Sequence, residues 1–143
     1  MVNEKPSILQ ACAVPYRDGS DGEPEFCLIT SSGRGDWVFP KGVIEPDETL
    51  KMTALKEAEE EAGLLGEVEG KPLGQYDYRK WGTTLRVTAF LMHVTGVEDE
   101  WDESDVRRRC WCSVKKARSK IQRDAILELL DKAITRLGAV SRQ

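Results

Sequence analysis

Apolar and polar residues alternate in short runs over the first third of the chain, and turn-forming segments separate the runs. SILQACAVPY (7–16) and FCLITSS (26–32) predict two strands joined by a Gly-, Pro- and Asp-rich loop at 18–25. VFP (38–40) predicts a brief third strand. The next segment, KGVIEPDE (41–48), predicts a loop whose glycine lets the backbone turn or approach a ligand.

A helical repeat of small apolar residues follows this loop. Asp47 is the expected N-cap, and Glu48 is expected in the first turn, where a negative charge favours the helix dipole. The apolar stripe consists of Leu50, Ala54, Leu55, Ala58 and Ala62. Gly63, followed by Leu64, predicts a left-handed cap, so the helix should end there.

The second half of the chain returns to strand-like patterns and closes with a helix. The expected elements are strands at 66–80 and 83–97 around a turn near Gly82, an acidic loop at 98–105, a strand at 106–114 and an amphipathic helix at 121–137. The helix should turn Ile121, Ile126, Leu127, Leu130 and Ile134 inward. The fold class is therefore α+β, with a mixed β-sheet between helices.

Composition narrows the picture further. A chain of 143 residues predicts a single domain spanning 1–143, and 40% hydrophobic with 32% charged residues is typical of a globular protein. No apolar run reaches the length of a membrane span and no signal peptide is evident, so the expected location is the cytoplasm. The four cysteines lie in apolar or strand-like runs and are interpreted as reduced packing residues. A net charge of -4 makes nucleic acid an unlikely partner.

Acidic residues crowd the last turns of the predicted helix, in the run EAEEE at 57–61. Glu57, Glu60 and Glu61 are spaced three and four residues apart and therefore share one edge of the helix. Near a helix C-terminus these carboxylates oppose the macrodipole as well as each other. An acidic run is ordinarily a solvated face, but carboxylates one turn apart also suit Mg²⁺, which takes oxygen ligands and usually keeps water and substrate phosphates.

The segment GVIEPDETLKMTALKEAEEEAGL, residues 42–64, resembles the Nudix box. That pattern is Gly, five residues, Glu, seven residues, Arg-Glu, an aliphatic residue, any residue, Glu-Glu, any residue, Gly, aliphatic. The matching positions are Gly42, Glu48, Glu57, Glu60, Glu61, Gly63 and Leu64. Lys56 replaces the usual arginine, so the charge is kept but the planar fork of a guanidinium is lost. Ala58 fills the aliphatic position.

The resemblance implies a Nudix fold and a hydrolase that cleaves a diphosphate linkage with Mg²⁺ or Mn²⁺. By match to the box, Glu57, Glu61 and the backbone carbonyl of Lys41 are the expected metal ligands. Glu60 is the expected proton acceptor, with Glu100 and Glu103 of the acidic loop as alternatives.

Other residues are candidates for the substrate side of the site. Arg34 and the Lys41 side chain either hold phosphate oxygens or solvate a turn, and Gly42 lies beside them. Glu48 either orients the site or favours the helix start. At most a subset of Arg107, Arg108 and Arg109 is expected to reach distal phosphates, since alternate residues of a strand face opposite sides.

The flanks of the box suggest a branch of the family. LITSSGRGDWVFPKG and VEDEWDESDVRRRCWCSVKKA resemble diphosphoinositol polyphosphate phosphohydrolases, whereas the FPKG form is similar to dinucleoside polyphosphate hydrolases. A small-molecule polyphosphate is thus the expected substrate, and a monomer or homodimer the expected state. Two alternatives remain open: removal of diphosphate from an RNA 5′ end, and a Nudix module that binds a nucleotide without cleaving it.

Overall fold

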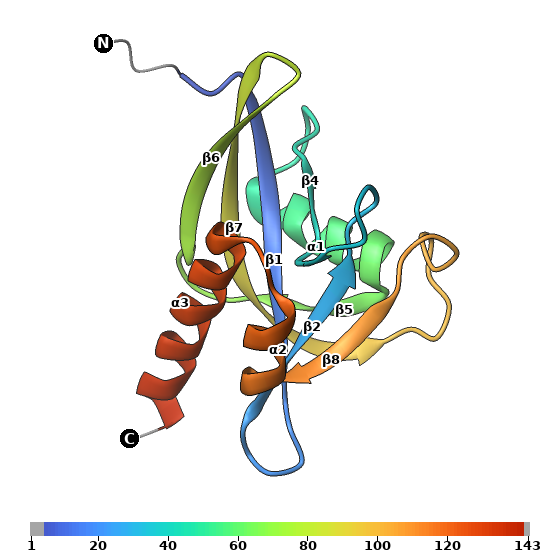
Figure 1. Ribbon diagram of the computed structural model, residues 1–143, viewed down its shortest axis with the longest axis vertical. Helices are drawn as coiled ribbons and strands as arrows, with labels where there is room; N and C mark the ends of the chain where they lie inside the picture. Colours follow the sequence, from blue (N-terminus) through green and yellow to red (C-terminus); the bar gives the residue numbers. More distant parts are fainter. Residues whose placement is uncertain (1–4, 142–143) are drawn as a thin grey trace.

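A computed structural model describes residues 5–141 of the chain. Its elements, in chain order, are β1 (Ile8–Asp18), β2 (Pro24–Thr30), β3 (Trp37–Val38), β4 (Lys41–Val43), α1 (Leu50–Ala62), β5 (Leu64–Val68), β6 (Gly74–Lys80), β7 (Thr83–Val97), β8 (Arg109–Ser113), α2 (Val114–Lys120) and α3 (Asp124–Ser141). Helix α1 lies behind the central strands in Figure 1, and α2 and α3 lie in front of them.

The strands form one mixed sheet. Within the described residues this sheet has eight strands. Its main path is β3-β2-β1-β7-β5, and off this path β4 pairs with β1, β6 with β7 and β8 with β2. Strands β1 and β7 run parallel at the centre, and the other pairs are antiparallel. The predicted α+β class with a mixed sheet is confirmed.

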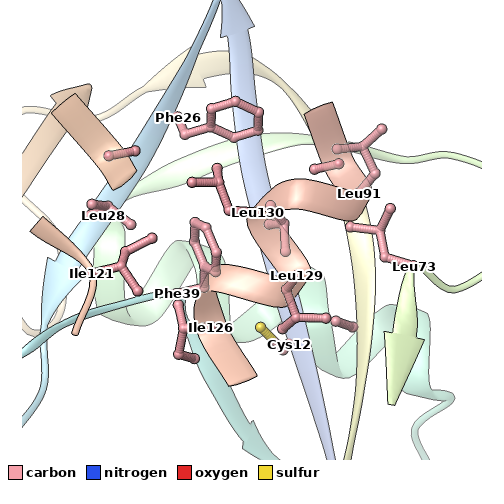
Figure 2. Close-up of a cluster of buried hydrophobic side chains, with 14 of the residues drawn as sticks. Cys12, Phe26, Leu28, Phe39, Leu73, Leu91, Ile121, Ile126, Leu129 and Leu130 are labelled. Carbon is pink, nitrogen blue, oxygen red and sulfur yellow. The ribbon is translucent and has the colours of Figure 1, made fainter. Parts of the chain in front are cut away.

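Alternation along β1 explains why both faces of the sheet need a helical layer. Ala11 and Ala13 pack into a cluster with the alanine stripe of α1, whereas Cys12 and Val14 point into a second cluster under α3. Figure 2 shows this second cluster, in which Phe26, Leu28 and Phe39 meet Leu129 and Leu130. The protein is therefore an α/β/α sandwich, as the resemblance implied.

Small side chains bring α1 close to the sheet. Ala54, Ala58 and Ala62 are fully buried, as predicted, while Leu50 and Leu55 are partly buried at the edge of the same cluster. Because the stripe carries no bulk, α1 lies against β1, β4 and β5 and holds its acidic edge near the strand that follows Pro40.

The start of α1 differs from the prediction. Thr49, not Asp47, is the N-cap, and its hydroxyl accepts a hydrogen bond from the backbone N of Met52 at 3.1 Å. Glu48 consequently precedes the helix and does not lie in its first turn. Both Asp47 and Thr49 have capping side chains, and tertiary packing selects the later one.

Two further predictions about strands are wrong. The segment 66–80 is not one strand but parts of β5 and β6, because the chain turns at Gly70, whose φ is 72°, and both pieces pair with β7. The segment 41–48 is not all loop, since Lys41–Val43 forms β4 by pairing with β1. The turn near Gly82 is confirmed.

The C-terminal elements also differ from the prediction. The strand expected at 106–114 is limited to Arg109–Ser113, and the short helix α2 was missed. The closing helix begins at Asp124, so Ile121 is buried from the end of α2 and not from α3. Ile126 and Leu130 are buried as predicted, and Leu129 and Ala133 join them.

Three of the four cysteines, Cys12, Cys27 and Cys112, are fully buried, and all four are free thiols, consistent with packing roles. None of the helices within residues 5–141 is long and apolar enough to cross a membrane.

Candidate active site

The acidic end of α1 is closed by a left-handed glycine, as the sequence predicted. Gly63 has φ 67° and ψ 34°, and its N–H donates to the carbonyls of Ala58 and Glu59. A Cβ at this position would meet Trp101 and Arg109 of the following loop and strand, so only glycine fits without a shift. The acidic run therefore ends against packed structure and not in open solvent.

Donors from the loop between β7 and β8 satisfy the last carbonyls of the helix. The backbone N of Glu103 donates to Glu60 O at 3.0 Å, and Trp101 Nε1 donates to Glu61 O at 2.9 Å. Arg109 donates to Ala62 O at 2.7 Å, and its guanidinium stacks 4.1 Å from the Trp101 ring centroid. A cation and several N–H groups thus face the negative end of the helix dipole.

Glu57 and Glu61 lie against β4. The Lys41 backbone N donates to Glu61 Oε1 at 3.2 Å, and Glu61 is only 7% exposed. A Cβ on Gly42 would stand 2.7 Å from Glu57 Cγ, so the glycine leaves the space that the Glu57 carboxylate fills. Glu57, Glu61 and Lys41, which the sequence predicted for the site, therefore lie close together in the structure. Gly42, a matching position of the same pattern, lies beside them.

Strand register turns the Lys41 backbone toward these acids. Ala13 N donates to Pro40 O and Ile44 N donates to Leu9 O, on either side of the pair Cys12 and Lys41. Lys41 therefore occupies a position whose N–H and C=O both point away from β1. Its N–H already reaches Glu61, and its carbonyl points to the same side.

Arg107 is the site residue that sequence reasoning placed wrongly. Arg107 was expected in a strand, as one of the candidates for contacts to distal phosphates. It instead precedes β8, and its Nη2 lies 3.3 Å from Glu61 Oε2. Its Nε donates to Glu103 Oε1 at 2.6 Å and its NH1 to Thr30 O at 2.9 Å. The only signal in the sequence was an unexplained basic cluster after an acidic loop, which says nothing about this pairing.

The other two arginines of the cluster do different work. Arg109 caps α1, and the Arg108 guanidinium lies 5.5 Å from the centroid of the Trp37 ring. Trp37 is half-buried and packs at the edge of the core under α3.

Burial governs the electrostatics of the carboxylate pair. Desolvation raises the pKa of Glu61 to about 8, the Arg107 charge opposes that rise, and the Glu57 charge adds to it. Desolvation also raises the pKa of Glu57, while a hydrogen bond with Glu61 lowers it. Without a further cation the pair therefore favours holding a proton near neutral pH.

Glu48 and Lys56 form a brace behind Glu57. Lys56 Nζ lies 2.7 Å from Glu48 Oε2 and 3.9 Å from Glu57 Oε2, and Thr53 donates to Glu48 at 2.8 Å. Hydrogen bonds from Lys56 and Thr53 lower the pKa of Glu48. The lysine that replaces the usual arginine thus links one matched glutamate to another, and the Glu48 contacts are internal to the protein.

The three candidates for the proton acceptor lie in different places. Glu60 and Glu100 line an open cleft of about 550 Å³ whose other walls are Lys56, Glu59, Glu98, Trp101 and Asp102. Glu103 instead is tied to Arg107, which contacts Glu61. Glu103 is therefore the loop glutamate connected to the carboxylate pair.

The candidates for phosphate contacts divide in a similar way. Lys41 Nζ donates to Tyr78 Oη at 3.3 Å, and Tyr78 in turn donates to Gln10 at 2.7 Å, so this ammonium is held beside β1 and β6. Arg34 is exposed in the loop between β2 and β3. Lys41 thus has a defined position, and Arg34 lies at the surface.

A divalent cation fits the donors present. Glu57, Glu61 and the Lys41 carbonyl offer hard oxygen donors, and Gly42 leaves room for the Glu57 carboxylate. Among residues 5–141 no group of three or more His, Cys, Asp or Glu side chains converges closely enough to hold a metal ion by itself. The donor set therefore suits Mg²⁺, which completes its shell with water and substrate oxygens, better than a metal that demands a full protein cage.

The α/β/α sandwich is the fold that the resemblance implied, and it brings the matched carboxylates Glu57 and Glu61 together beside the β4 backbone. The NUDIX domain family matches residues 8–132, and the chain belongs to this family and is a Nudix-type hydrolase of phosphoric anhydrides.

Three comparisons illustrate the similarity. "Nudix hydrolase 17, mitochondrial" of Arabidopsis thaliana is 37% identical over 138 residues, which cover 91% of this chain and 75% of the relative. Mouse "Diphosphoinositol polyphosphate phosphohydrolase 3-alpha" is 32% identical over 106 residues, covering 72% of this chain and 63% of that protein. The crystal structure of a C. elegans Ap4A hydrolase superposes with a TM-score of 0.74 at 24% identity, covering 91% of this chain and 98% of that one, and shares the fold.

Proposed function

We propose that the protein hydrolyses the diphosphate group of a small polyphosphate in a reaction that depends on Mg²⁺ or Mn²⁺. The observation that carries this proposal is the pair Glu57 and Glu61, held against the backbone of Lys41 and Gly42 in β4. Like charges are costly to hold together in a desolvated place, and a divalent cation is the partner that repays the cost.

The proposed roles of the chain's own groups follow from their positions. Glu57, Glu61 and the Lys41 carbonyl hold the ion, and the Lys56–Glu48 brace steadies Glu57. A bound divalent cation supplies neutralisation of the diphosphate charge and activation of water. Lys41 Nζ, Arg34 and the backbone of Gly42 are the proposed contacts to phosphate oxygens.

Hydrolysis consumes one water, which forms a new bond to phosphorus while the bridging P–O bond breaks. A carboxylate must take the water proton. Glu60 is the proposed acceptor on the basis of the box, and Glu103 is the alternative because it is linked through Arg107 to Glu61. Substituting each in turn by glutamine separates them when kcat is measured at saturating metal, since only loss of the true acceptor then lowers turnover and a change in metal affinity does not contribute.

The proposed substrate is a diphosphoinositol polyphosphate, with dinucleoside polyphosphates second. The mouse relative named as a diphosphoinositol polyphosphate phosphohydrolase aligns in sequence with 72% of this chain at 32% identity. The likeness to the Ap4A hydrolase is one of fold. Location in the cytoplasm and a monomeric or homodimeric state stay predictions.

The test is a phosphate-release screen with and without Mg²⁺ over diphosphoinositol polyphosphates, diadenosine polyphosphates, nucleotide sugars and triphosphorylated RNA. Magnesium-dependent turnover of an inositol or dinucleoside polyphosphate is the expected result. Preferred cleavage of RNA, with an affinity that falls steeply as salt rises, would replace the proposed substrate. Tight binding of a nucleotide without turnover would make the protein a binding module.

A further inference from the structure

We propose that Arg107 is an internal counter-ion of the metal site: it pairs with Glu61 when no ion is bound and must release Glu61 when the ion binds. The inference rests on the proposed function, because it requires Glu61 to be a ligand of a divalent cation. It assigns to Arg107 a restraint on metal affinity, which no residue of the box explains.

Both oxygens of Glu61 are engaged in this structure. Oε1 accepts from the Lys41 backbone N at 3.2 Å, and Oε2 lies 3.3 Å from Arg107 NH2. The side chains of Arg107 and Glu61 are 11% and 9% exposed, so little water reaches the ion pair. The carboxylate is therefore arranged around a guanidinium.

The guanidinium has two anchors that do not involve Glu61. Nε donates to Glu103 Oε1 at 2.6 Å and NH1 donates to Thr30 O at 2.9 Å. When NH2 leaves Glu61, these two bonds keep the side chain in place. Release of one contact out of three is a small movement, which suits a group that alternates with an ion.

The ion and the arginine compete for the same oxygen. A magnesium ligand oxygen stands about 2.0–2.1 Å from the ion, and a guanidinium at Oε2 occupies that approach. The two positive charges also repel strongly in a partly desolvated site. Arg107 therefore stabilises the protein without metal and weakens the binding of the ion. A higher ion concentration is then needed to fill the site.

Glu103 sets how firmly Arg107 holds Glu61. A carboxylate at Glu103 draws part of the guanidinium charge to itself, and without it the full charge faces Glu61. Changes at the two positions should therefore move metal affinity in opposite directions.

The experiment measures Mn²⁺ binding by electron paramagnetic resonance, with Mg²⁺ as competitor and no substrate. Arg107→Gln is expected to bind Mn²⁺ about tenfold more tightly than wild type, which corresponds to ~1.4 kcal/mol, and to melt at a lower temperature without metal. Glu103→Gln is expected to bind Mn²⁺ more weakly. Adding Glu103→Gln to Arg107→Gln should change affinity far less than it does in the wild-type chain, because the group that transmits its effect is gone.

Arg109→Gln is the matched control. It removes the same charge and loosens the same loop, since Arg109 donates to Ala62 O and Glu98 O, but it touches no carboxylate of the pair. It should lower the metal-free melting temperature without the tenfold gain in affinity. If Arg107→Gln does not fold, Arg107→Lys, which keeps the charge and loses the fork, is expected to bind Mn²⁺ between wild type and the tenfold gain.

The results separate the two levels of the proposal. Unchanged or weaker Mn²⁺ binding in Arg107→Gln, with normal binding in wild type, would make Arg107 a structural clamp and overturn this inference alone. An equal gain in Mn²⁺ affinity in Arg109→Gln would mean that removing any nearby positive charge has this effect. That result would overturn the inference about Arg107 as well. No Mn²⁺ binding in wild type would remove the metal site and with it the proposed function.

Discussion

Gly42→Ala tests the contact on which the carboxylate pair depends. The added Cβ would stand 2.7 Å from Glu57 Cγ and 2.5 Å from Glu57 Oε1. Gly42 does not have a positive φ, so alanine suits its backbone and the clash with Glu57 is the whole perturbation. The far end of Glu57 is flexible, and it will turn away before the strand moves.

The expected magnitudes differ for stability and catalysis. Overpacking of a tight core costs roughly 1–3 kcal/mol, and a movable side chain places this variant near the lower limit, about 1 kcal/mol. For a domain of this size that is a shift of about 3–5 °C in melting temperature. A misplacement of about 1 Å at a catalytic group lowers turnover about 100-fold, and Glu57 is displaced by at least that much.

The assay pairs a thermal melt with kcat in saturating Mg²⁺, on the best substrate from the screen. Gly33→Ala is the control, because its added Cβ would meet nothing within 4 Å and its backbone is not left-handed. Turnover of Gly42→Ala within about threefold of wild type would refute the contact. A melting temperature lowered by more than 10 °C would instead show that the strand, and not Glu57, yields.

Four further outcomes test the site and the fold. Glu61→Gln should lower turnover at least about 100-fold, measured as kcat, with only a few degrees of change in melting temperature; near wild-type turnover would remove Glu61 from the site. Burial raises the pKa of Glu61 to about 8 from 4.5, so the folded state binds more protons than the unfolded state between these values and metal-free stability should fall as pH rises through the window. Since metal binding needs the deprotonated form, the Mg²⁺-induced rise in melting temperature should be larger at pH 8.5 than at pH 6.5 and lose this dependence in Glu61→Gln; an equal rise at both pH values in wild type would contradict this. Lys56→Arg should keep or raise kcat, because a fork spans Glu48 and Glu57 better than an ammonium does, and a large loss would show that the brace needs lysine. Trp81→Asn should raise the melting temperature by a few degrees and leave kcat unchanged, since Trp81 is 75% exposed at φ 55° in the hairpin turn before Gly82 and its ring contact is with the Lys80 ammonium, 4.5 Å from the ring centroid. A fall in melting temperature would mean that this cation–π contact outweighs the backbone strain, and a fall in kcat would mean that the indole contributes to the site.

Local signals were enough to predict α1 and its acidic edge. The alanine spacing, the glycine after the last acidic residue and the spacing of Glu57, Glu60 and Glu61 all act within a few residues of one another, so a single helix realises them. Gly42 and Lys41 came instead from the resemblance to the Nudix box, which places them at a fixed distance before the helix.

Features that depend on distant parts of the chain escaped prediction. Arg107 meets Glu61 and Thr30 only after the sheet has assembled, and nothing in the local pattern of 106–114 distinguishes it from Arg108 or Arg109. Strand β4 exists because β1 pairs with it, although its own residues are typical of a turn. In each case tertiary contacts override the local preference.

The crowded glutamates of α1 pose an electrostatic problem that the fold answers without a metal ion. Arg109 faces the last carbonyls, Arg107 faces Glu61, and Lys56 of α1 itself lies between Glu48 and Glu57, so the helix end and these three glutamates each have a cation nearby. The acidic edge is therefore compatible with a stable metal-free protein, and repulsion alone does not require the ion for folding. A bound ion would add a contact that Arg107 lacks the geometry to make, because an ion can bind the carboxylates and a diphosphate together. A polyphosphate that binds the same ion would offset part of the cost of displacing the arginine, so ion and substrate should bind more tightly together than either does alone.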